Sequence, residues 1–265
     1  MNRFTWSPSR ILLVAFSAVV ALVLMGPTLV VVPLSFTGER SFQFPPQDWS
    51  MQWYRNFFEN PAWLDAATYS LRIGLVVALL ATVLGTAAAM ALTSGTGRWR
   101  MPARAFLLMP MIVPGVITAI GIYYVFLRLG LTQEFWGYVL AHTVLAVPFV
   151  VVAVSASLQS LDRRLVQAAW SLGAGPWAAF RQVTVPLIAP GVLTGAVFAF
   201  LTSFDEAIVS LFLAGPFSRT LPIQIYQSVT SEVDPTIAAA STMLLVVTSI
   251  FIVAVGFLTR AQNRR

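Results

Sequence analysis

The amino-acid sequence predicts an all-α membrane protein with six transmembrane helices and with both chain ends in the cytoplasm. Of its 265 residues, 58% are hydrophobic and only 10% are charged, whereas about a quarter of the residues in a soluble domain are charged. A helix needs about 20 residues to cross the hydrocarbon core of a bilayer. Six apolar stretches reach that length, namely residues 11–32, 69–92, 105–127, 137–158, 192–214 and 237–258. We expect these spans to form a single domain, residues 1–265.

The distribution of arginine predicts the orientation, because cytoplasmic loops of membrane proteins carry an excess of basic residues. With both ends inside, the five outer arginines are Arg40, Arg55, Arg72, Arg128 and Arg219. The eleven inner arginines are Arg3, Arg10, Arg98, Arg100, Arg104, Arg163, Arg164, Arg181, Arg260, Arg264 and Arg265. The net charge of +6, from 16 arginines against 10 acids, is explained by arginines that collect in loops on one side of a membrane. We therefore expect a lipid bilayer and no nucleic acid around the chain, since no basic stripe alternates with aromatic residues.

Composition also excludes several kinds of chemistry. The chain has no cysteine, so it can form neither a disulfide nor a thiolate metal site. Its single histidine, His142, cannot make a metal-binding cluster alone, and we expect it to be a packed or interfacial polar residue. The Gly-x4-Gly-Lys-Ser/Thr loop that binds nucleotide phosphates is absent from the sequence. We predict no cofactor, no metal and no catalytic residue, and ATP hydrolysis would have to come from another polypeptide.

Two connections between the spans are long, and the outer one covers residues 33–68. It carries Trp49, Trp53, Tyr54 and Trp63 among scattered charges. Aromatic residues of this kind commonly sit at the depth of the lipid headgroups. We expect an interfacial segment, and contact with an external partner protein is the alternative.

The inner connection, about residues 159–190, predicts two short helices joined by a glycine corner. Leu165, Ala168, Ala169 and Leu172 recur at helical spacing. Gly173 and the pair at 175–176, glycine then proline, end that helix. The proline suits the first turn of a second helix. An exposed apolar corner of this kind needs a partner that covers it.

The residues of this loop are similar to a known family signature. The run Gln167-Ala168-Ala169, then Gly173, then Val183-Thr184-Val185-Pro186 resembles the signature loop of ABC importer permeases. The family pattern is a Glu-Ala-Ala triplet, a glycine four positions after the last alanine, and an Ile-x-Leu-Pro-like ending. Gln167 departs from the family's glutamate and lacks its charge. The resemblance implies that a short helix docks into a groove on an ATPase subunit through Gln167, Ala168, Ala169, Trp170, Ser171, Leu172, Gly173 and Ala174.

The same resemblance implies the type I ABC importer permease fold and a complete set of partners. The chain would lie in the bacterial cytoplasmic (inner) membrane. Two ATPase subunits, a second related permease and a periplasmic or extracellular substrate-binding protein would complete the importer. A second permease is also expected because six helices alone cannot easily enclose a polar pathway. In one branch of this family, the second permease is usually a different chain, which gives a heterodimer.

Two adjacent acids in the fifth expected span are the candidate residues for the transport pathway. Asp205 and Glu206 lie well inside an apolar run, and ionisable groups in a membrane are costly and usually functional. An acidic patch on the pathway would attract a cation and repel an anion. The alternative is a helix that breaks or ends here and leaves both acids in water.

The neighbourhood of these acids resembles the spermidine/putrescine branch of the family. The resemblance covers Ser203-Phe204-Asp205-Glu206, Gly215-Pro216, Thr220-Leu221-Pro222 and Tyr226. It implies that Asp205 meets an amine of a polyamine, with Glu206 second and with Ser203 and Tyr226 on the pathway. The branch also contains permeases for opines, amino acids and phosphonates, so these substrates stay open. Two alternatives come from other classes of membrane protein. One is an ion-coupled secondary carrier, which would usually show repeated halves. The other is an intramembrane enzyme, which would need a constellation such as a Ser/His pair.

Prolines and glycines within the spans predict kinks and close packing. Pro110 and Pro114 in the third span and Pro148 in the fourth each remove a backbone donor and bend a helix. Two roles are open for these prolines, namely helix packing and a hinge for alternating access. Gly85 with Ala89, and Gly191 with Gly195, have the small-xxx-small spacing that lets membrane helices approach closely.

Overall fold

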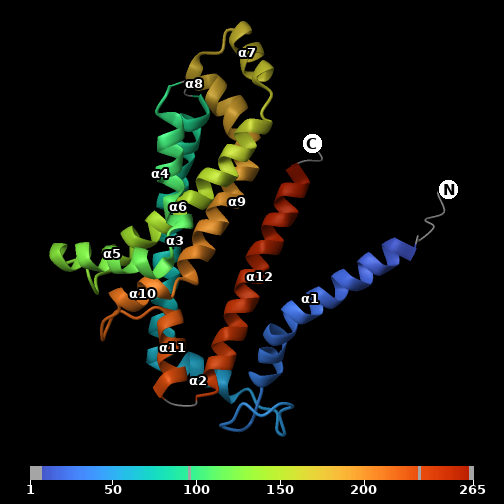
Figure 1. Ribbon diagram of the computed structural model, residues 1–265, viewed down its shortest axis with the longest axis vertical. Coiled ribbons are helices and arrows are strands. Elements are labelled where there is room, and N and C mark those ends of the chain that lie inside the picture. Colours follow the sequence, from blue (N-terminus) through green and yellow to red (C-terminus); the bar gives the residue numbers. More distant parts are fainter. Residues whose placement is uncertain (1–7, 95–96, 232–233, 263–265) are drawn as a thin grey trace. The chain divides into compact units, whose positions relative to one another are not determined.

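The computed structural model describes residues 8–94, 97–231 and 234–262, and helices make up most of them (Figure 1). Five helical segments are long and apolar enough to cross a membrane: Ser9–Gly26, Pro61–Thr93, Phe135–Ser160, Pro176–Phe204 and Thr236–Ala254. A bent pair, α4 (Arg100–Ile112) and α5 (Gly115–Leu129), would supply a sixth span. The predicted all-α membrane class is thus confirmed. The predicted orientation stays a prediction, and Arg3, Arg264 and Arg265 lie outside the described residues.

The third expected span, residues 105–127, is sharply bent at Pro114, one of the two prolines for which a kink was predicted. The axes of α4 and α5 differ by 103° across a short break. Val113 ends α4 with φ −72° and ψ 132°, the extended conformation that a following proline imposes on the residue before it. Pro114 then precedes the first residue of α5. Pro148, in contrast, lies inside α6 (Phe135–Ser160), which continues past it.

The fifth expected span, residues 192–214, is also corrected. The helical segment begins earlier, with α8 (Pro176–Ala179), and passes through a π-helical turn, η1 (Phe180–Thr184), into α9 (Val185–Phe204). It ends at Phe204, where Asp205 leaves the helix. A short helix, α10 (Ile208–Leu213), follows. The chain is therefore broken at the acid pair, as the alternative interpretation of these residues required.

The described chain divides into two compact units. The first takes its residues from Met1–Asn60 and Gln227–Val246, and includes α1 (Pro8–Leu34), α2 (Gln52–Glu59) and the start of α12 (Thr236–Gln262). The indole of Trp53 donates a hydrogen bond of 2.7 Å to the carbonyl of Thr37. The amide of Asn56 donates one of 2.7 Å to the hydroxyl of Thr236. These bonds hold α2 within the unit.

The aromatic residues of the outer connection do not behave alike. Trp53 and Trp63 are buried at 8% and 1% exposure, so the expectation of headgroup contact is wrong for these two side chains. The hydroxyl of Tyr54 pairs with that of Ser35 at 2.7 Å. Trp49 is two-thirds exposed, and of the four it is the one available to lipid or to a partner.

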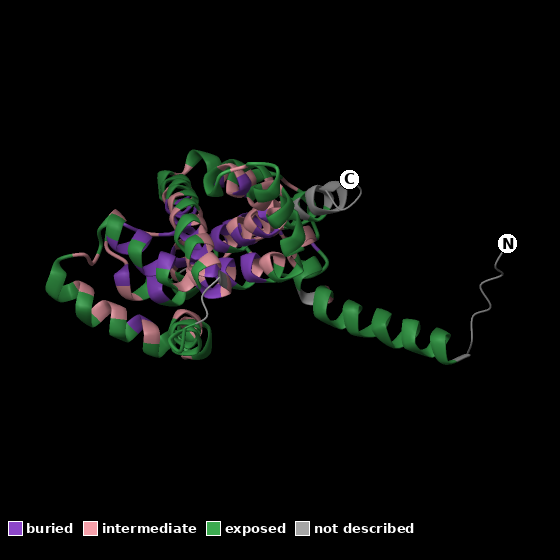
Figure 2. Ribbon diagram, turned by 90° about the horizontal axis from the view of Figure 1, so that it is seen from above, coloured by how far each residue is buried: buried purple, intermediate pink, exposed green. Residues whose placement is uncertain are grey.

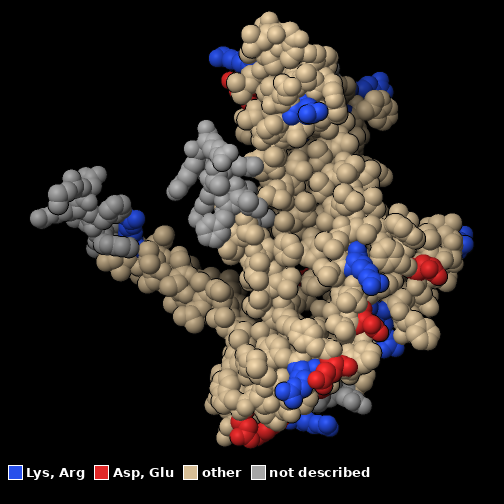
Figure 3. Space-filling model, turned by 180° about the vertical axis from the view of Figure 1, so that it is seen from behind, with Lys and Arg blue, Asp and Glu red and all other residues tan. Residues whose placement is uncertain are grey.

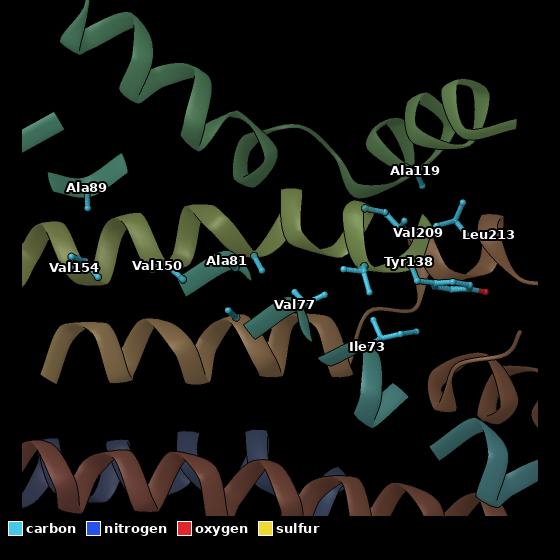
Figure 4. Packing of buried hydrophobic residues seen from close by; sticks show 14 of the residues in the cluster. Ile73, Val77, Ala81, Ala89, Ala119, Tyr138, Val150, Val154, Val209 and Leu213 are labelled. Carbon is cyan, nitrogen blue, oxygen red and sulfur yellow. The ribbon is translucent and has the colours of Figure 1, made fainter. Parts of the chain in front are cut away.

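The second unit, drawn from Pro61–Tyr226 and Val247–Arg265, has its core between α3 (Pro61–Ser94), α6 and α9. Figure 4 shows Val77 and Ala81 of α3 facing Val150 of α6 in this core. Glycines permit the close approach: a Cβ on Gly85 would lie 2.6 Å from Cβ of Val150, and one on Gly195 would lie 3.0 Å from its Cα. The predicted close packing at these glycines is confirmed.

The outward surfaces of the helices are apolar. Figure 2 shows most of α1 coloured as exposed, and none of its span Ser9–Gly26 is buried. In the view of Figure 3, charged side chains are few and most of the surface is neither acidic nor basic. Such a surface suits lipid as the surrounding solvent, because lipid imposes no penalty on exposed apolar side chains.

Candidate functional site

The expected coupling loop forms a short helix, α7 (Arg163–Ser171), with a defined start. The carboxylate of Asp162 accepts a hydrogen bond of 2.9 Å from the backbone N–H of Arg164. An aspartate that caps the first turn satisfies a donor that the helix itself leaves open, which stabilises a helix by about 1 kcal/mol. The predicted helical spacing of this segment is thus confirmed, and its first residue is set by a side chain outside it.

The corner after α7 explains the glycine in the signature. Gly173 has φ +86°, a left-handed conformation that costs other residues roughly 1–2 kcal/mol. Its N–H donates to the carbonyl of Trp170 at 2.9 Å, and the N–H of Ala174 donates to the carbonyl of Ala169 at 3.0 Å. These two bonds form a Schellman motif, a helix ending closed by backbone bonds alone. The spacing from the alanine pair to the glycine is therefore the spacing that this cap requires.

The predicted coupling residues lie together on α7 and its corner, and many of them are exposed. Leu172 is 89% exposed and Trp170 is 54% exposed, and Gln167, Ala168 and Ser171 are exposed as well. Ala169 and Ala174 are partly buried. An apolar corner this open has the chemistry of a docking surface.

The opposite side of α7 faces the helix bundle across a cavity of about 440 Å³. Gln167 and Trp170 line it from α7, while Met90 of α3 and Leu158 of α6 line it from the bundle. Gln167 therefore borders both the exposed surface and the interior side of the loop. The end of α3 that carries Met90 is the one expected in the cytoplasm.

The loop and the acid pair stand at the two ends of one helical segment. Pro176–Phe204 passes the length and hydropathy requirements as a single segment of 29 residues, which spans about 43 Å at 1.5 Å per residue. Its first part contains the π-helical turn Phe180–Thr184, a feature that is frequent at functional positions. Sequence reasoning missed this continuity, because Pro186 and Pro190 suggested a boundary. Pro186 closely follows the π-helical turn, at the start of α9, and Pro190 lies within α9.

The two acids have different surroundings at the break. Asp205 is exposed, and its backbone N–H closes the last turn of α9 by donating to the carbonyl of Leu201 at 3.0 Å. The carboxylate of Glu206 accepts a hydrogen bond of 2.8 Å from the N–H of Val209, in the first turn of α10. Glu206, which precedes the N-cap residue Ala207, thus satisfies a donor in the first turn of the helix that restarts after the break, while Asp205 is exposed in the single chain.

Glu206 also lines a cavity of about 300 Å³ where two helix breaks meet. Val113 and Gly115, from the break between α4 and α5, lie on its wall, together with Phe149 of α6. The break between α4 and α5 and the break at the acid pair are therefore neighbours. Irregular backbone at membrane depth is tolerated where it is covered by protein or lines a cavity.

The other two candidate pathway residues have different positions. Ser203 is 4% exposed, and its Oγ lies 2.9 Å from Nδ1 of His142. Tyr226 is 52% exposed on α11 (Leu221–Ser231), a separate element. The chain thus brings Ser203, Asp205 and Glu206 together at the end of α9, with Ser203 turned toward the protein interior.

His142 is the residue of this region whose contacts the sequence did not reveal. Its ring is 1% exposed, and its second nitrogen, Nε2, lies 3.1 Å from Oγ of Ser210. Its predicted character as a packed polar residue is confirmed. The two serines are 61 and 68 residues away along the chain, so no local pattern announces the pairing.

Residues 81–265 match the family described as binding-protein-dependent transport system inner membrane component. The match includes α6, the loop with α7, and the break at the acid pair. It also includes every candidate site residue named above.

Two proteins of known function are similar over nearly the whole chain. The spermidine/putrescine transport system permease protein PotC of Escherichia coli (strain K12) is 31% identical over 255 residues, which cover 96% of each chain. The putrescine transport system permease protein PotI of the same strain is 32% identical over 254 residues, covering 91% of this chain and 89% of PotI.

A solved structure has the same fold. It is a bacterial alginate ABC transporter in complex with a periplasmic protein that holds an alginate pentasaccharide. The superposition has a TM-score of 0.72 and covers 95% of this chain and 94% of the other, at 14% sequence identity. The expected fold of an ABC importer permease is thereby confirmed.

Proposed function

The chain belongs to the binding-protein-dependent transport system inner membrane components, and from that membership we propose that its solute is a small organic cation of the spermidine and putrescine type. It would form the pathway together with a second, related permease. The closely similar relatives PotC and PotI are named for these solutes. An amino acid, an opine or a phosphonate is the alternative solute, and charge separates a phosphonate from a polyamine.

One observation carries this proposal: the exposed carboxylate of Asp205 at a helix break within an apolar bundle. A carboxylate facing lipid at the membrane centre costs roughly 2.5–3.5 kcal/mol on insertion scales. Broken helices in transporters commonly line the substrate site. Asp205 avoids the cost if it faces a water-filled pathway shared with the second permease. A flexible polycation has few other ways to cross a wall of apolar helices.

The two acids then have separate tasks. Glu206 holds α10 through the N–H of Val209, so part of its accepting capacity is already used. Asp205 is exposed, and its carboxylate forms no side-chain hydrogen bond with another of the described residues. Asp205 would therefore meet the amine, and Glu206 would maintain the shape of the break. Ser203 would support that shape from inside, and Tyr226 would border the pathway from α11.

The helical segment Pro176–Phe204 ends at the acid pair, and its opposite end would be coupled to ATP hydrolysis. We assign ATP hydrolysis to a separate ATPase subunit, into which α7 docks through the exposed Trp170 and Leu172. The Schellman cap makes this corner stiff, and Pro176–Phe204 connects it to Asp205. A tilt of α7 would therefore move the break. This arrangement has both chain ends in the cytoplasm, in keeping with the arginine distribution.

The test is transport by the complete importer in sealed vesicles. The chain is purified with its ATPase, second permease and binding protein, and ATP-driven uptake of labelled spermidine, putrescine and phosphonate is compared. We expect uptake of the polyamines, and competition between them. Uptake of the phosphonate alone would overturn the cation assignment and leave family membership intact.

A further inference from the structure

One side chain on α6 is bonded to both sides of the break in the fifth span. Nδ1 of His142 lies 2.9 Å from Oγ of Ser203, in the last turn of α9. Nε2 lies 3.1 Å from Oγ of Ser210, in α10. The residues between the two serines include Asp205 and Glu206. A single imidazole therefore spans the interruption that presents the acids.

The bridge is complete and excludes water. His142, Ser203 and Ser210 are 1%, 4% and 0% exposed. A neutral imidazole offers one donor and one acceptor, and a serine hydroxyl can serve as either. Either tautomer of the ring can therefore satisfy both bonds. Leaving one of these buried groups unpaired would be destabilising, because it would lose its hydrogen bonds to water without a replacement.

Tyr138, one turn before His142 on α6, adds a third attachment. The hydroxyl of Tyr138 donates a hydrogen bond of 2.7 Å to the carbonyl of Ser218, and its ring centroid lies 6.0 Å from that of His142. Residues four apart on a helix lie on one face. One face of α6 thus holds the chain at Ser203, Ser210 and Ser218, before and after α10.

Two simpler roles for the histidine fit less well. A serine beside a histidine suggests a nucleophile and its base, but both hydroxyls here are almost fully buried, which leaves no room for a substrate. A packed polar residue with no further role would need only hydrogen-bond partners for its own two ring nitrogens. It would have no reason to pair with the two half-helices that flank the acids.

We propose that His142 is a positioning residue that fixes the two half-helices α9 and α10 relative to each other and thereby aims Asp205 into the pathway. The effect on uptake rests on the proposed function, whereas the effect on the break does not. When α9 moves, α10 moves with it, because the imidazole joins them. The acids then keep their position relative to the two half-helices when these move.

The first test reports the position of the break without any solute. The chain has no cysteine, so Ala207→Cys gives it one thiol, at an exposed position between the acids and α10. The rate of labelling by a water-soluble maleimide is measured in the assembled importer, with and without His142→Leu. We expect the rate to rise about fivefold, the effect of losing roughly 1 kcal/mol of restraint.

A matched control comes from the next residue. Thr143 is 7% exposed, and its hydroxyl bonds within its own helix to the carbonyl of Val139 at 2.7 Å. Thr143→Val removes a buried hydroxyl without touching the bridge, so the labelling rate should not change. Ser203→Ala and Ser210→Ala, which remove one bond each, serve if His142→Leu does not assemble. Equal labelling rates in the bridge variants and in Thr143→Val would overturn the proposal.

The second test uses side chains that replace one ring nitrogen at a time. In His142→Asn the amide nitrogen can take the place of Nδ1, and in His142→Gln that of Nε2. Each variant keeps one bond and loses the other. We expect each to raise the apparent KM for putrescine uptake by up to about tenfold, while the ATPase rate without substrate stays unchanged.

The outcomes separate this proposal from the function on which it rests. If the wild-type importer takes up no polyamine but the labelling rate responds to His142→Leu, the positioning role stands and the cation assignment falls. If polyamine uptake is normal in His142→Asn and His142→Gln and labelling does not respond, the positioning role is refuted and the cation assignment stands.

Discussion

The chain interrupts regular helix at two places on the proposed route from ATP to solute, and the two are built differently. The corner at Gly173 is closed by backbone bonds to Trp170 and Ala169, all within six residues. The break at Asp205 is held by one side chain of α6, His142, whose two serine partners are 61 and 68 residues away along the chain. A locally closed corner keeps its shape when a partner binds or leaves. A break held by a neighbouring helix has the shape that the neighbour imposes.

The difference matches the two tasks. A docking element has to transmit force, so a stiff corner on an exposed helix is suitable. A solute site has to change its access, so its geometry is better controlled by the packing of helices that move against each other. Pro176–Phe204 joins the two as one helical segment. Each of the following changes acts on one interruption, or on the surface beside it.

The largest effect is expected from Gly173→Val. A β-branched residue cannot adopt φ +86° without strain, so the Schellman cap should open and the docking surface should be lost. ATP hydrolysis stimulated by the loaded binding protein should fall to near its unstimulated rate. Gly175→Val is the control, because Gly175 has φ −67° and ψ 166° and no neighbour near its Cβ. Similar activity in the two variants would remove the corner from the mechanism.

A smaller effect is expected from Leu172→Asp, which leaves the cap in place and changes only the exposed apolar side chain. Full burial of a leucine stabilises an association by roughly 1.5–3 kcal/mol. The affinity of the permease for its ATPase should therefore fall by about tenfold or more. Leu129→Asp, at a 64% exposed leucine on α5, is the matched control. A comparable loss of affinity in both variants would point to general damage rather than docking.

At the break, Glu206→Ala should be more harmful than Glu206→Gln. The amide oxygen of glutamine can still accept from the N–H of Val209, whereas alanine leaves that donor uncapped at a cost of about 1 kcal/mol. Initial uptake rates should fall about fivefold in the alanine variant and about twofold or less in the glutamine variant. The reverse order would assign Glu206 to charge rather than to capping.

The smallest effect is expected from Gln167→Glu, which restores the charge of the family signature. Gln167 is exposed and also borders the cavity beneath α7, so a side chain of the same length should be accepted there. Stimulated ATP hydrolysis should stay within about fivefold of the wild-type rate, because an exposed charge contributes about 1 kcal/mol at most. A severe defect would show that the ATPase groove opposite this position has changed.

The two interruptions also mark what the sequence could predict. The corner was predictable, because Gly173 and the Gly-Pro pair after it are local signals with a backbone mechanism. The apolar spans were predictable for the same reason, since length and composition alone identify them. The acid pair could be singled out because carboxylates are rare in such a run.

The sequence did not predict the end of α9 at Asp205 or the angle between α4 and α5 at Val113. The apolar pattern continues through Asp205 into α10, and through Val113 into α5, so periodicity gave one span in each case. At Pro114 the signal was present, but a proline inside a span can either bend a helix or end it. The pairing of His142 with Ser203 and Ser210 depends on how α6 packs against α9 and α10, which no single segment specifies.

The most direct test of the account is the uptake of putrescine by three importers that differ at one carboxylate each. Asp205→Asn removes the charge from the exposed acid at the break, Glu206→Gln removes it from the capping acid, and Glu134→Gln removes it from an exposed acid at the start of α6. With assembly verified by size-exclusion chromatography, we expect Asp205→Asn to lose at least about tenfold in uptake, the effect of roughly 1.4 kcal/mol. Glu206→Gln should lose far less and Glu134→Gln nothing. Full putrescine uptake by Asp205→Asn would contradict the central claim.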